Sequence, residues 1–328
     1  MLATTRTKVA PAKPIDQLAA LCKASADPLR LQVLRALRND SFGVSELCAL
    51  FGIRQNALSH HLKVLASAGL VATRREGNSI FYRRAELGQQ AELEALQQQI
   101  FHSVDQFELP VGLRKNLALL QRQREENSRN FFHLNAHKFR QQQDLIASYE
   151  QYAQTVAEVL QEAPLTQHRI ALEVGPGDGH FLQELAPAFE QVIALDNTSA
   201  MLEQARISAT EAGLNNIRFI HGDTGSAELE GLQADCVIIN MVLHHTTDPR
   251  QILLDIAGYL SPDAVVLITD LCRHDQAWAR ENCGDLWLGF EPQDLTHWAG
   301  EAGLKDIASV FLAQRNGFQI QVRLFGQH

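Results

Sequence analysis

The chain is poor in cysteine and has no long run of apolar residues. Its five cysteines are odd in number and show no paired spacing, which argues against a disulfide scaffold and for a reducing compartment. The most apolar stretches, Cys236 to Ile239 and Ala264 to Ile268, are strand-sized, far short of the roughly 20 residues that a membrane-spanning helix needs. The first residues lack the apolar run of a signal peptide. We therefore expect a cytoplasmic protein with no membrane segment.

The chain does contain enough apolar material for two cores, because 45% of its 328 residues are hydrophobic. Single cores tend to stop growing near about 250–300 residues, so two domains are expected. Charge divides along the same lines. Residues 1–90 hold 13 Lys and Arg against 6 Asp and Glu, whereas residues 91–328 hold 16 against 32. A basic segment attached to an acidic body predicts that only the first part meets a polyanion.

Residues 14–90 have the pattern of a winged helix-turn-helix. A helix is expected to begin at Asp27-Pro28, because the carboxylate caps it and proline suits the first helical position. Two further helices, at 45–51 and about 55–68, each end at a glycine and are separated by only a few residues. Two helices joined in this way, the second with polar amides near its start, are typical of a protein that reads the major groove of DNA.

A hairpin is expected after the second of these helices. Residues 70–75 and 80–84 are strand-like and flank a turn at 76–79. Four arginines suit this hairpin to lie along phosphates, namely Arg74, Arg75, Arg83 and Arg84. The basic charge predicts DNA binding, and the alternative is a winged helix that contacts only protein.

The run Leu-Ser-His-His-Leu-Lys-Val-Leu at 58–65, followed by Ala-Gly-Leu-Val at 68–71, resembles the ArsR/SmtB family of winged-helix transcriptional regulators. The resemblance implies a homodimer that places the helix at 55–68 in the major groove of a palindromic double-stranded DNA operator. By similarity, Gln55 and Asn56 pair with adenine while arginines hold phosphates. The residues expected to bind DNA are Arg54, Gln55, Asn56, Ser59, His60, Lys63, Arg74 and Arg75.

Members of this family often sense metals, but the ligands are missing from this part of the chain. Glu46-Leu47-Cys48 is present, yet Leu50 stands where the family's second cysteine would be. A lone thiolate cannot build a soft-metal site of three or four ligands. Residues 86–102 also lack the carboxylate and histidine ligands that other members carry. We therefore expect no metal site, with Cys48 as a small core residue.

Residues 87–127 are expected to form a helical connector that breaks near Pro110. One apolar stripe follows its helix and consists of Leu93, Leu96, Ile100, Val104 and Phe107. The stripe fits either a dimer-forming helix, which we favour, or a helix packed on its own domain. The solvated segment 121–126 marks the boundary. The expected parts are a disordered tail at 1–13, the winged domain at 14–90, the connector at 91–127 and a second domain at 128–328.

From Arg169 onward, buried apolar runs alternate with helical segments such as 180–186 and 199–212. This alternation predicts an α/β domain with a parallel sheet and right-handed crossovers. The expected strands are 170–174, 192–196, 217–221, 235–240 and 264–269, with late strands near 307–312 and 319–325.

Acids and glycines gather where the first three of these strands end. The first strand leads into Glu173-Val174-Gly175-Pro176-Gly177-Asp178-Gly179, whereas a dinucleotide fingerprint would need a glycine at position 180. This spacing suits a cofactor without a pyrophosphate, whose ammonium group the acid can meet. Asp196 closes the second strand, where an acid can accept both ribose hydroxyls, and Asp223 follows the third strand.

These residues resemble the class I S-adenosylmethionine-dependent methyltransferases, which implies a Rossmann-like fold with a seven-stranded mixed sheet. The residues carried over to cofactor binding are Glu173, Gly175, Gly177, Gly179, Asp196, Met201, Asp223, Thr224 and Asn240. Residues 128–140 resemble the capping helix of the ubiquinone/menaquinone-biosynthesis-like branch, and residues 274–304 resemble its pocket-shaping insertion. The whole chain is similar to ArsR–methyltransferase fusion regulators.

The methyl acceptor is expected to be a small molecule. Met241-Val242-Leu243 follows Asn240 in place of the Pro-Pro-aromatic sequence of DNA amino-methyltransferases, and an acidic domain repels a duplex. His244 and His245 are candidates for a catalytic base, although either can equally be a core histidine. Cys272 and Cys283 are expected to be structural, the alternative being a role in arsenic or selenium methylation. The second domain is then an enzyme or a sensor that binds the cofactor without turnover.

Overall fold

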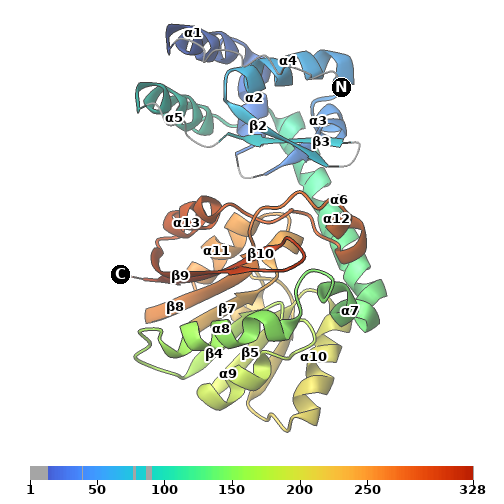
Figure 1. Ribbon diagram of the computed structural model, residues 1–328, viewed down its shortest axis with the longest axis vertical. Helices are drawn as coiled ribbons and strands as arrows, with labels where there is room; N and C mark the ends of the chain where they lie inside the picture. Colours follow the sequence, from blue (N-terminus) through green and yellow to red (C-terminus); the bar gives the residue numbers. More distant parts are fainter. Residues whose placement is uncertain (1–13, 39, 77–78, 86–90, 328) are drawn as a thin grey trace, which may run out of the picture. The chain divides into compact units, whose positions relative to one another are not determined.

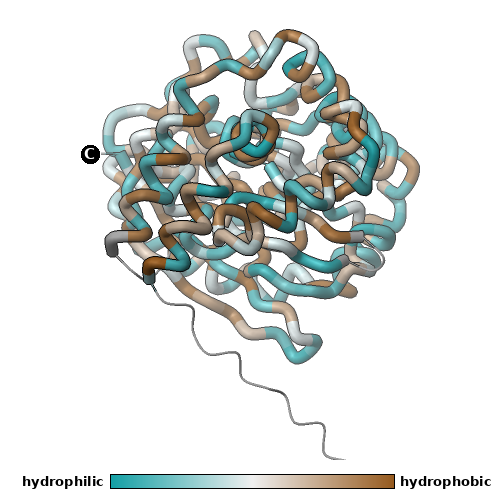
Figure 2. Tube along the Cα trace, turned by 90° about the horizontal axis from the view of Figure 1, so that it is seen from above, coloured by the Kyte–Doolittle hydropathy of each residue, from teal (hydrophilic) through white to brown (hydrophobic). Residues whose placement is uncertain are grey.

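The computed structural model describes residues 14–38, 40–76, 79–85 and 91–327, which fall into two units (Figure 1). The units divide between Gln121 and Arg122, inside the long helix α6 (Val111–Asn135) and at the start of the solvated segment 121–126. The tail at 1–13 and the wing residues 77–78 lie outside the described part of the chain. No helix of the described part is long and apolar enough to cross a membrane. Hydrophilic and hydrophobic residues are interspersed along the trace (Figure 2).

The first unit is a helical domain with a small antiparallel sheet in the order β1-β3-β2. Its elements before α6 are α1 (Pro14–Ser25), α2 (Pro28–Ala36), β1 (Phe42–Gly43), α3 (Val44–Phe51), α4 (Gln55–Ser67), β2 (Val71–Glu76), β3 (Ser79–Arg84) and α5 (Ala91–Asp105). The two helices and two strands expected from the sequence agree with α3, α4, β2 and β3 to within one residue. This confirms the winged helix-turn-helix pattern.

Local signals explain where these helices begin and end. The carboxylate of Asp27 accepts a hydrogen bond from the backbone N–H of Arg30 at 3.0 Å, which caps α2 as expected. Gly52 ends α3 in the left-handed conformation at φ 64°. On α4, Leu58, Leu62 and Leu65 are all fully buried in the core of the unit.

The apolar stripe of the connector packs largely on its own unit. Leu93, Leu96 and Ile100 of α5 are partly buried against the core of the first unit, and Val104 is only 7% exposed. Phe107, by contrast, is 71% exposed. The packed alternative therefore accounts for most of the stripe, and the dimer expected from the resemblance stays a prediction.

Arg84 does not face outward as expected of a wing arginine. Its guanidinium donates two hydrogen bonds to the carboxylate of Asp105, at 3.0 and 2.6 Å, and a third to the backbone carbonyl of Leu34. These bonds tie β3 to α5 and α2, so Arg84 is a structural residue here and the prediction that it lies along phosphates was wrong.

The second unit is built on a seven-stranded mixed sheet in the order β6-β5-β4-β7-β8-β10-β9, as expected. Among these described strands, β10 runs antiparallel to both of its neighbours, β8 and β9, and all other neighbouring pairs are parallel. The strands are β4 (Ile170–Val174), β5 (Gln191–Asp196), β6 (Ile217–His221), β7 (Ala234–Asn240), β8 (Leu260–Leu271), β9 (Lys305–Ala313) and β10 (Gln319–Gly326). The helices are α7 (Phe139–Gln143), α8 (Tyr149–Gln161), α9 (Leu182–Ala188), α10 (Ser199–Glu211), α11 (Pro249–Ala257), α12 (Trp278–Cys283) and α13 (Pro292–Glu301).

Helices cover both faces of this sheet, and alternate residues of its strands feed two cores (Figure 1). On β7, for example, Cys236 and Ile238 join the core beneath α8, α9 and α10, whereas Val237 and Ile239 join the core beneath α11 and α13. The chain order reverses between β4 and β7, and in sheets of this kind ligands bind at that reversal, outside the carboxyl ends of the strands.

Candidate functional site

A pocket opens at the carboxyl ends of β4, β5 and β7, where the chain order reverses. It lies within the second unit and is walled by the glycine loop after β4, by the start of α10, by the loop after β7 and by residues 128–152. Every residue that the sequence predicts for cofactor binding lines it, apart from Gly179. The structure thus brings together residues that are up to 67 positions apart in the chain.

The glycine loop after β4 needs a backbone that other residues rarely adopt. Gly175 and Gly177 have φ values of 68° and 59°, in the left-handed region. A Cβ on Gly175 would lie 2.5 Å from a methyl carbon of Val242, and a Cβ on Gly177 would lie 3.0 Å from the ring of Phe139. Their lack of side chains therefore keeps this end of the pocket open for a ligand.

Gly179 does not line the pocket. Its lack of a side chain instead allows the loop to pass close to the backbone of α10. We expect Gly179→Ala to destabilise the second unit by about 3 kcal/mol, since its φ is 82° and a new Cβ would lie 2.8 Å from the backbone Cα of Ala205. Gly213→Ala is the matched control, because Gly213 has φ 71° but nothing within 4 Å. It should cost only about 1 kcal/mol.

Urea unfolding followed by tryptophan fluorescence measures this difference, because all three tryptophans lie in the second unit. Equal losses of stability in the two variants would contradict the close approach of Gly179 to Ala205.

Glu173 and Asn240 present polar atoms to the pocket that have no hydrogen-bond partner in the described part of the chain. Glu173 is 2% exposed, and its Oε2 has no hydrogen-bond partner among the described residues. The same holds for both side-chain polar atoms of Asn240. Burial raises the pKa of Glu173 to about 8, and the nearby carboxylate of Asp178 adds to the rise. Buried polar groups are normally hydrogen-bonded, so this wall is built for a ligand with complementary polar groups.

Three further predicted residues lie around the pocket. Asp196, at the end of β5, accepts a hydrogen bond from the backbone N–H of Thr198 at 2.7 Å, and burial raises its pKa to about 6. The side chain of Asp223 accepts from the N–H of Gly225, while the hydroxyl of Thr224 donates to Asp255. Asp223 and Thr224 therefore shape their own loop, in addition to lining the pocket.

The two histidines after β7 have different positions. His245 lines the pocket, and the side-chain amide of Gln143 lies 3.3 Å from its Nε2. His244 is fully buried and does not line the pocket; its Nδ1 lies 2.7 Å from the carboxylate of Asp270. The geometry therefore keeps His245 as a candidate to contact a methyl acceptor and removes His244 from that position.

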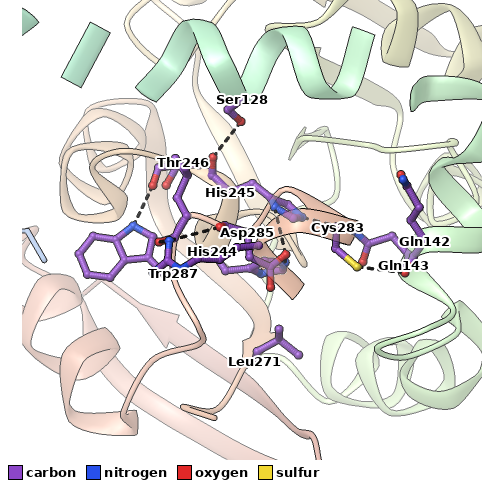
Figure 3. A network of polar contacts seen from close by, with 12 residues as sticks. Ser128, Gln142, Gln143, His244, His245, Thr246, Leu271, Cys283, Asp285 and Trp287 are labelled. Carbon is purple, nitrogen blue, oxygen red and sulfur yellow. Dashed lines mark hydrogen bonds and ion pairs between the residues drawn. The ribbon is translucent and has the colours of Figure 1, made fainter. Parts of the chain in front are cut away.

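Both histidines lie within 4 Å of the carboxylate of Asp285 (Figure 3). Burial raises the pKa of Asp285 to about 7, against the opposing effect of His244. Burial and the adjacent His244 hold the pKa of His245 well below its usual value, and the backbone of Gly284 opposes this. The pKa of His244 is raised because the carboxylates of Asp270 and Asp285 outweigh its burial. Asp285 lies 40 and 41 positions from the two histidines in sequence, so no motif of regular spacing predicts that these side chains lie together.

An aromatic cap over the pocket was also only partly anticipated. Residues 128–140 do reach the pocket as the resemblance implied, through Ser128, Phe132, Phe139 and Arg140. Tyr149 and Tyr152 of α8 were not anticipated, although their three-residue spacing places both rings on one face of that helix.

Residues 274–304, expected to shape the substrate pocket, do not line it. Trp287, Phe290 and Trp298 instead pack against one another with ring centroids 5.4–6.3 Å apart, as expected of a small core. Cys272 and Cys283 are buried, and burial raises the pKa values of their thiols to about 11 and about 12. Burial therefore disfavours the reactive thiolate form of both side chains.

In the first unit, the predicted DNA-binding residues lie on one helix and one strand. Arg54, Gln55, Asn56, His60 and Lys63 are exposed at the start and along the outer face of α4, and Ser59 is half-buried. On β2, Arg75 is exposed and Arg74 is half-buried. The arrangement presents polar and basic side chains on the helix that follows the turn.

Comparison with known proteins finds a similar family for each unit. Residues 26–74 match a family described as a helix-turn-helix domain, and residues 165–303 match one described as a methyltransferase domain. The transcriptional regulator NmtR of Mycobacterium tuberculosis is 42% identical over 77 residues, which are 22% of this chain and 64% of that protein. The uncharacterized methyltransferase YcgJ of Bacillus subtilis is 31% identical over 104 residues, which are 32% of this chain and 41% of that protein.

A solved structure shows the fold of the second unit. The 1,6-didemethyltoxoflavin-N1-methyltransferase of Burkholderia thailandensis, with bound 1,6-didemethyltoxoflavin and S-adenosylhomocysteine, has a TM-score of 0.50 at 19% identity. The match covers 63% of this chain and 90% of that chain. Each of the two curated relatives above is matched over less than two thirds of its length.

Proposed function

The chain joins a helix-turn-helix domain of the ArsR/SmtB type to a methyltransferase domain, and from this we propose a transcriptional regulator that methylates a small molecule. It binds a double-stranded DNA operator in the cytoplasm as a homodimer and uses S-adenosylmethionine as methyl donor. The observation that carries the proposal is the row of unsatisfied polar atoms on Glu173 and Asn240 beside the left-handed glycine loop.

The residues of the pocket fit this cofactor. Glu173 offers a buried carboxylate for an ammonium group, and Asp196 offers a carboxylate at the end of β5 for ribose hydroxyls. Gly175 and Gly177 leave room where a Cβ would collide with Val242 or Phe139. Met201, 3% exposed, supplies an apolar surface for the adenine, with Asp223 and Thr224 on the neighbouring loop. The cofactor supplies an activated methyl group when bound.

The chain's own residues then have to position the acceptor and take up its proton. Phe132, Phe139, Tyr149 and Tyr152 give the open side of the pocket an apolar, aromatic wall that excludes water. His245 is the candidate base, because its ring lines the pocket. Burial and the adjacent His244 lower its pKa, which keeps the ring neutral and also makes it a weaker proton acceptor than an exposed histidine. A hydrophobic small molecule with an ionisable group fits such a wall better than a nucleic acid does.

Fluorescence anisotropy on the DNA upstream of the protein's own gene tests whether the two units act together. We expect a several-fold change in operator affinity when S-adenosylmethionine or S-adenosylhomocysteine is added, because an effector that alters DNA binding must itself bind the two states differently. Equal effects of both ligands, with no turnover of the donor, would identify a sensor instead of an enzyme. Tight DNA binding that ignores both ligands would contradict the coupling.

Substitution of Asn56 tests separately whether α4 recognises the bases of the operator. We expect Asn56→Ala to weaken operator binding about tenfold and to relax base preference at one position, because a bidentate amide contact to adenine is lost. Gln98→Ala, on the exposed side of α5, is the control and should leave binding unchanged. An unaltered profile of preferred operators for Asn56→Ala would contradict base reading by this residue.

A further inference from the structure

A cluster of buried metal-ligand side chains lies behind the acceptor end of the pocket. His244 and His245 come from η3 (Leu243–His245), the turn after β7, and Asp285 comes from the segment after α12. One ligand atom from each lies within 4.8 Å of the other two. The carboxylate Oδ1 of Asp285 is 3.9 Å from His244 Nε2 and 3.6 Å from His245 Nδ1. These three side chains are here called the His-His-Asp cluster (Figure 3).

The two separations from Asp285 are too long for hydrogen bonds and a little longer than those of a metal site, and the two histidine nitrogens lie within 4.8 Å of each other. A good N–H to oxygen hydrogen bond spans about 2.7–3.2 Å. In a tetrahedral zinc site with bonds near 2.0–2.1 Å, neighbouring ligand atoms lie about 3.3–3.4 Å apart. Asp285 therefore stands slightly too far from both histidines to bond them directly. A shift of a few tenths of an ångström would bring its carboxylate to coordination distance.

Polar atoms aimed into the gap lack partners. His244 Nε2 and both carboxylate oxygens of Asp285 are buried and make no hydrogen bond among the described residues. The side chains of His244 and Asp285 have no exposed surface. A buried group left without a partner is costly, and clusters of such groups call for an unseen water or ion.

Side chains lie beside the outer nitrogen of each imidazole, where they would support a metal-bound tautomer, and the backbone of Gly284 also acts on His245. The carboxylate of Asp270 lies 2.7 Å from His244 Nδ1 and accepts its proton, which leaves Nε2 with a free electron pair. The amide of Gln143 lies 3.3 Å from His245 Nε2, and its carbonyl oxygen accepts that proton when the amide is turned. A carboxylate behind a ligating histidine is the usual outer support of a zinc site.

The charges also call for a cation. Asp270 and Asp285 are two carboxylates with no more than 2% of their surface exposed. Arg280 acts on Asp285 from nearby, but its guanidinium donates to the backbone carbonyls of Asp285 and Leu286. Both carboxylates lie beside the two imidazoles, whose ring centroids are 3.9 Å apart. One divalent ion balances both carboxylates and leaves both histidines neutral.

We propose that His244 Nε2, His245 Nδ1 and the Asp285 carboxylate bind a divalent first-row transition-metal ion, with Asp270 as the outer carboxylate. Two imidazoles and one carboxylate suit zinc or ferrous iron, and leave at least one coordination position for water or another ligand. The metal ligands that the sequence lacks are the family's cysteine pair and its ligands at 86–102, whereas this site is formed by parts of the second unit that are 40 positions apart.

The ion would fix the wall against which the methyl acceptor lies. It ties the turn after β7 to the segment after α12, and His245, one of its ligands, lines the pocket. The binding of the ion itself is independent of cofactor binding, because none of its ligands is a residue assigned to the cofactor. With the ion bound, both nitrogens of His245 are engaged, by the ion and by Gln143, so His245 then positions the acceptor and does not accept its proton.

Metal binding is tested on the full chain after treatment with a chelator. Titration with Zn²⁺ in a calorimeter is expected to show one tight site in the wild type that is lost in Asp285→Asn, which keeps the side chain's shape. The exposed His297 provides the control, and His297→Ala should keep the site. Asp270→Asn should weaken binding about 10–100-fold without removing a ligand.

Two further measurements guard against variants that fail to fold. Zn²⁺ should raise the unfolding temperature of the wild-type second unit, followed by tryptophan fluorescence, and should not raise that of Asp285→Asn. Co²⁺ in the site should give visible d–d absorption without thiolate charge transfer, because Cys283 is not a ligand. Equal zinc stoichiometry in the wild type and Asp285→Asn would overturn the proposal, as would the absence of any tight site.

Discussion

Replacing Asp196 with asparagine is expected to reduce the affinity for S-adenosylmethionine about a hundredfold. The side chain closes β5 at the pocket, and one of its oxygens already accepts from the backbone of Thr198 at 2.7 Å. That bond fixes the carboxylate in place for two ribose hydroxyls. Asparagine keeps one acceptor oxygen without its charge and replaces the other with an N–H₂ group that cannot accept from a ribose hydroxyl. Hydrogen bonds to a charged group each contribute about 1.5–3 kcal/mol, so losing one and weakening the other costs about two powers of ten in affinity.

Calorimetry on the full chain measures this change. Glu203→Gln is the matched control, because it removes one carboxylate from an exposed position of the neighbouring helix α10 and should leave the affinity unaltered. Tryptophan fluorescence during urea unfolding checks that Asp196→Asn keeps its second unit folded. Unchanged affinity in a folded Asp196→Asn variant would show that the cofactor does not use this strand end.

The parts of the fold that could be predicted from the sequence are those whose signals are local. The strands at 170–174 and 217–221 have the expected bounds, because each is a short apolar run bordered by turn residues. The loop after β4 was predictable for the same reason, since glycine marks left-handed backbone and the chain itself places Glu173 next to it. The edge of a parallel sheet then brings the other strand ends to the same place.

What could not be predicted depends on partners that are distant in the chain. The sequence around Arg84 is that of a basic wing, and nothing local shows that Asp105 receives its guanidinium. His244 and His245 are adjacent in sequence, yet His244 is fully buried beside Asp270, whereas His245 lines the pocket. Burial of ionisable groups is a tertiary property, so composition and spacing carry no signal for it.

Binding of the cofactor is also expected to release a proton, and the affinity is expected to rise with pH. Glu173 has its pKa raised to about 8 in the free protein, so it is mostly protonated at neutral pH. A bound ammonium group favours the charged carboxylate and lowers that pKa in the complex. Because the complex then holds fewer protons than the free protein, the affinity increases about tenfold per pH unit below about pH 8 and levels off above it.

The pKa of about 6 for Asp196 sets the lower end of this window. Below that pH the loss of a second carboxylate charge should make the affinity fall more steeply. Of these two carboxylates, only Glu173 changes its protonation between the two pKa values. The affinity of Glu173→Gln should therefore not change with pH in that range. At pH 8 its affinity should be about a hundredfold weaker, because it lacks the charge-assisted bond to the ammonium.

Calorimetry in two buffers with different ionisation enthalpies counts the released protons directly. S-adenosylhomocysteine keeps the ammonium group but lacks the sulfonium charge, so it separates the two possible sources of the effect. Close to one proton released with both ligands assigns the response to Glu173 and the ammonium group. Release with S-adenosylmethionine alone would move the response to the sulfonium, and a pH slope that survives in Glu173→Gln would contradict the role of this residue altogether.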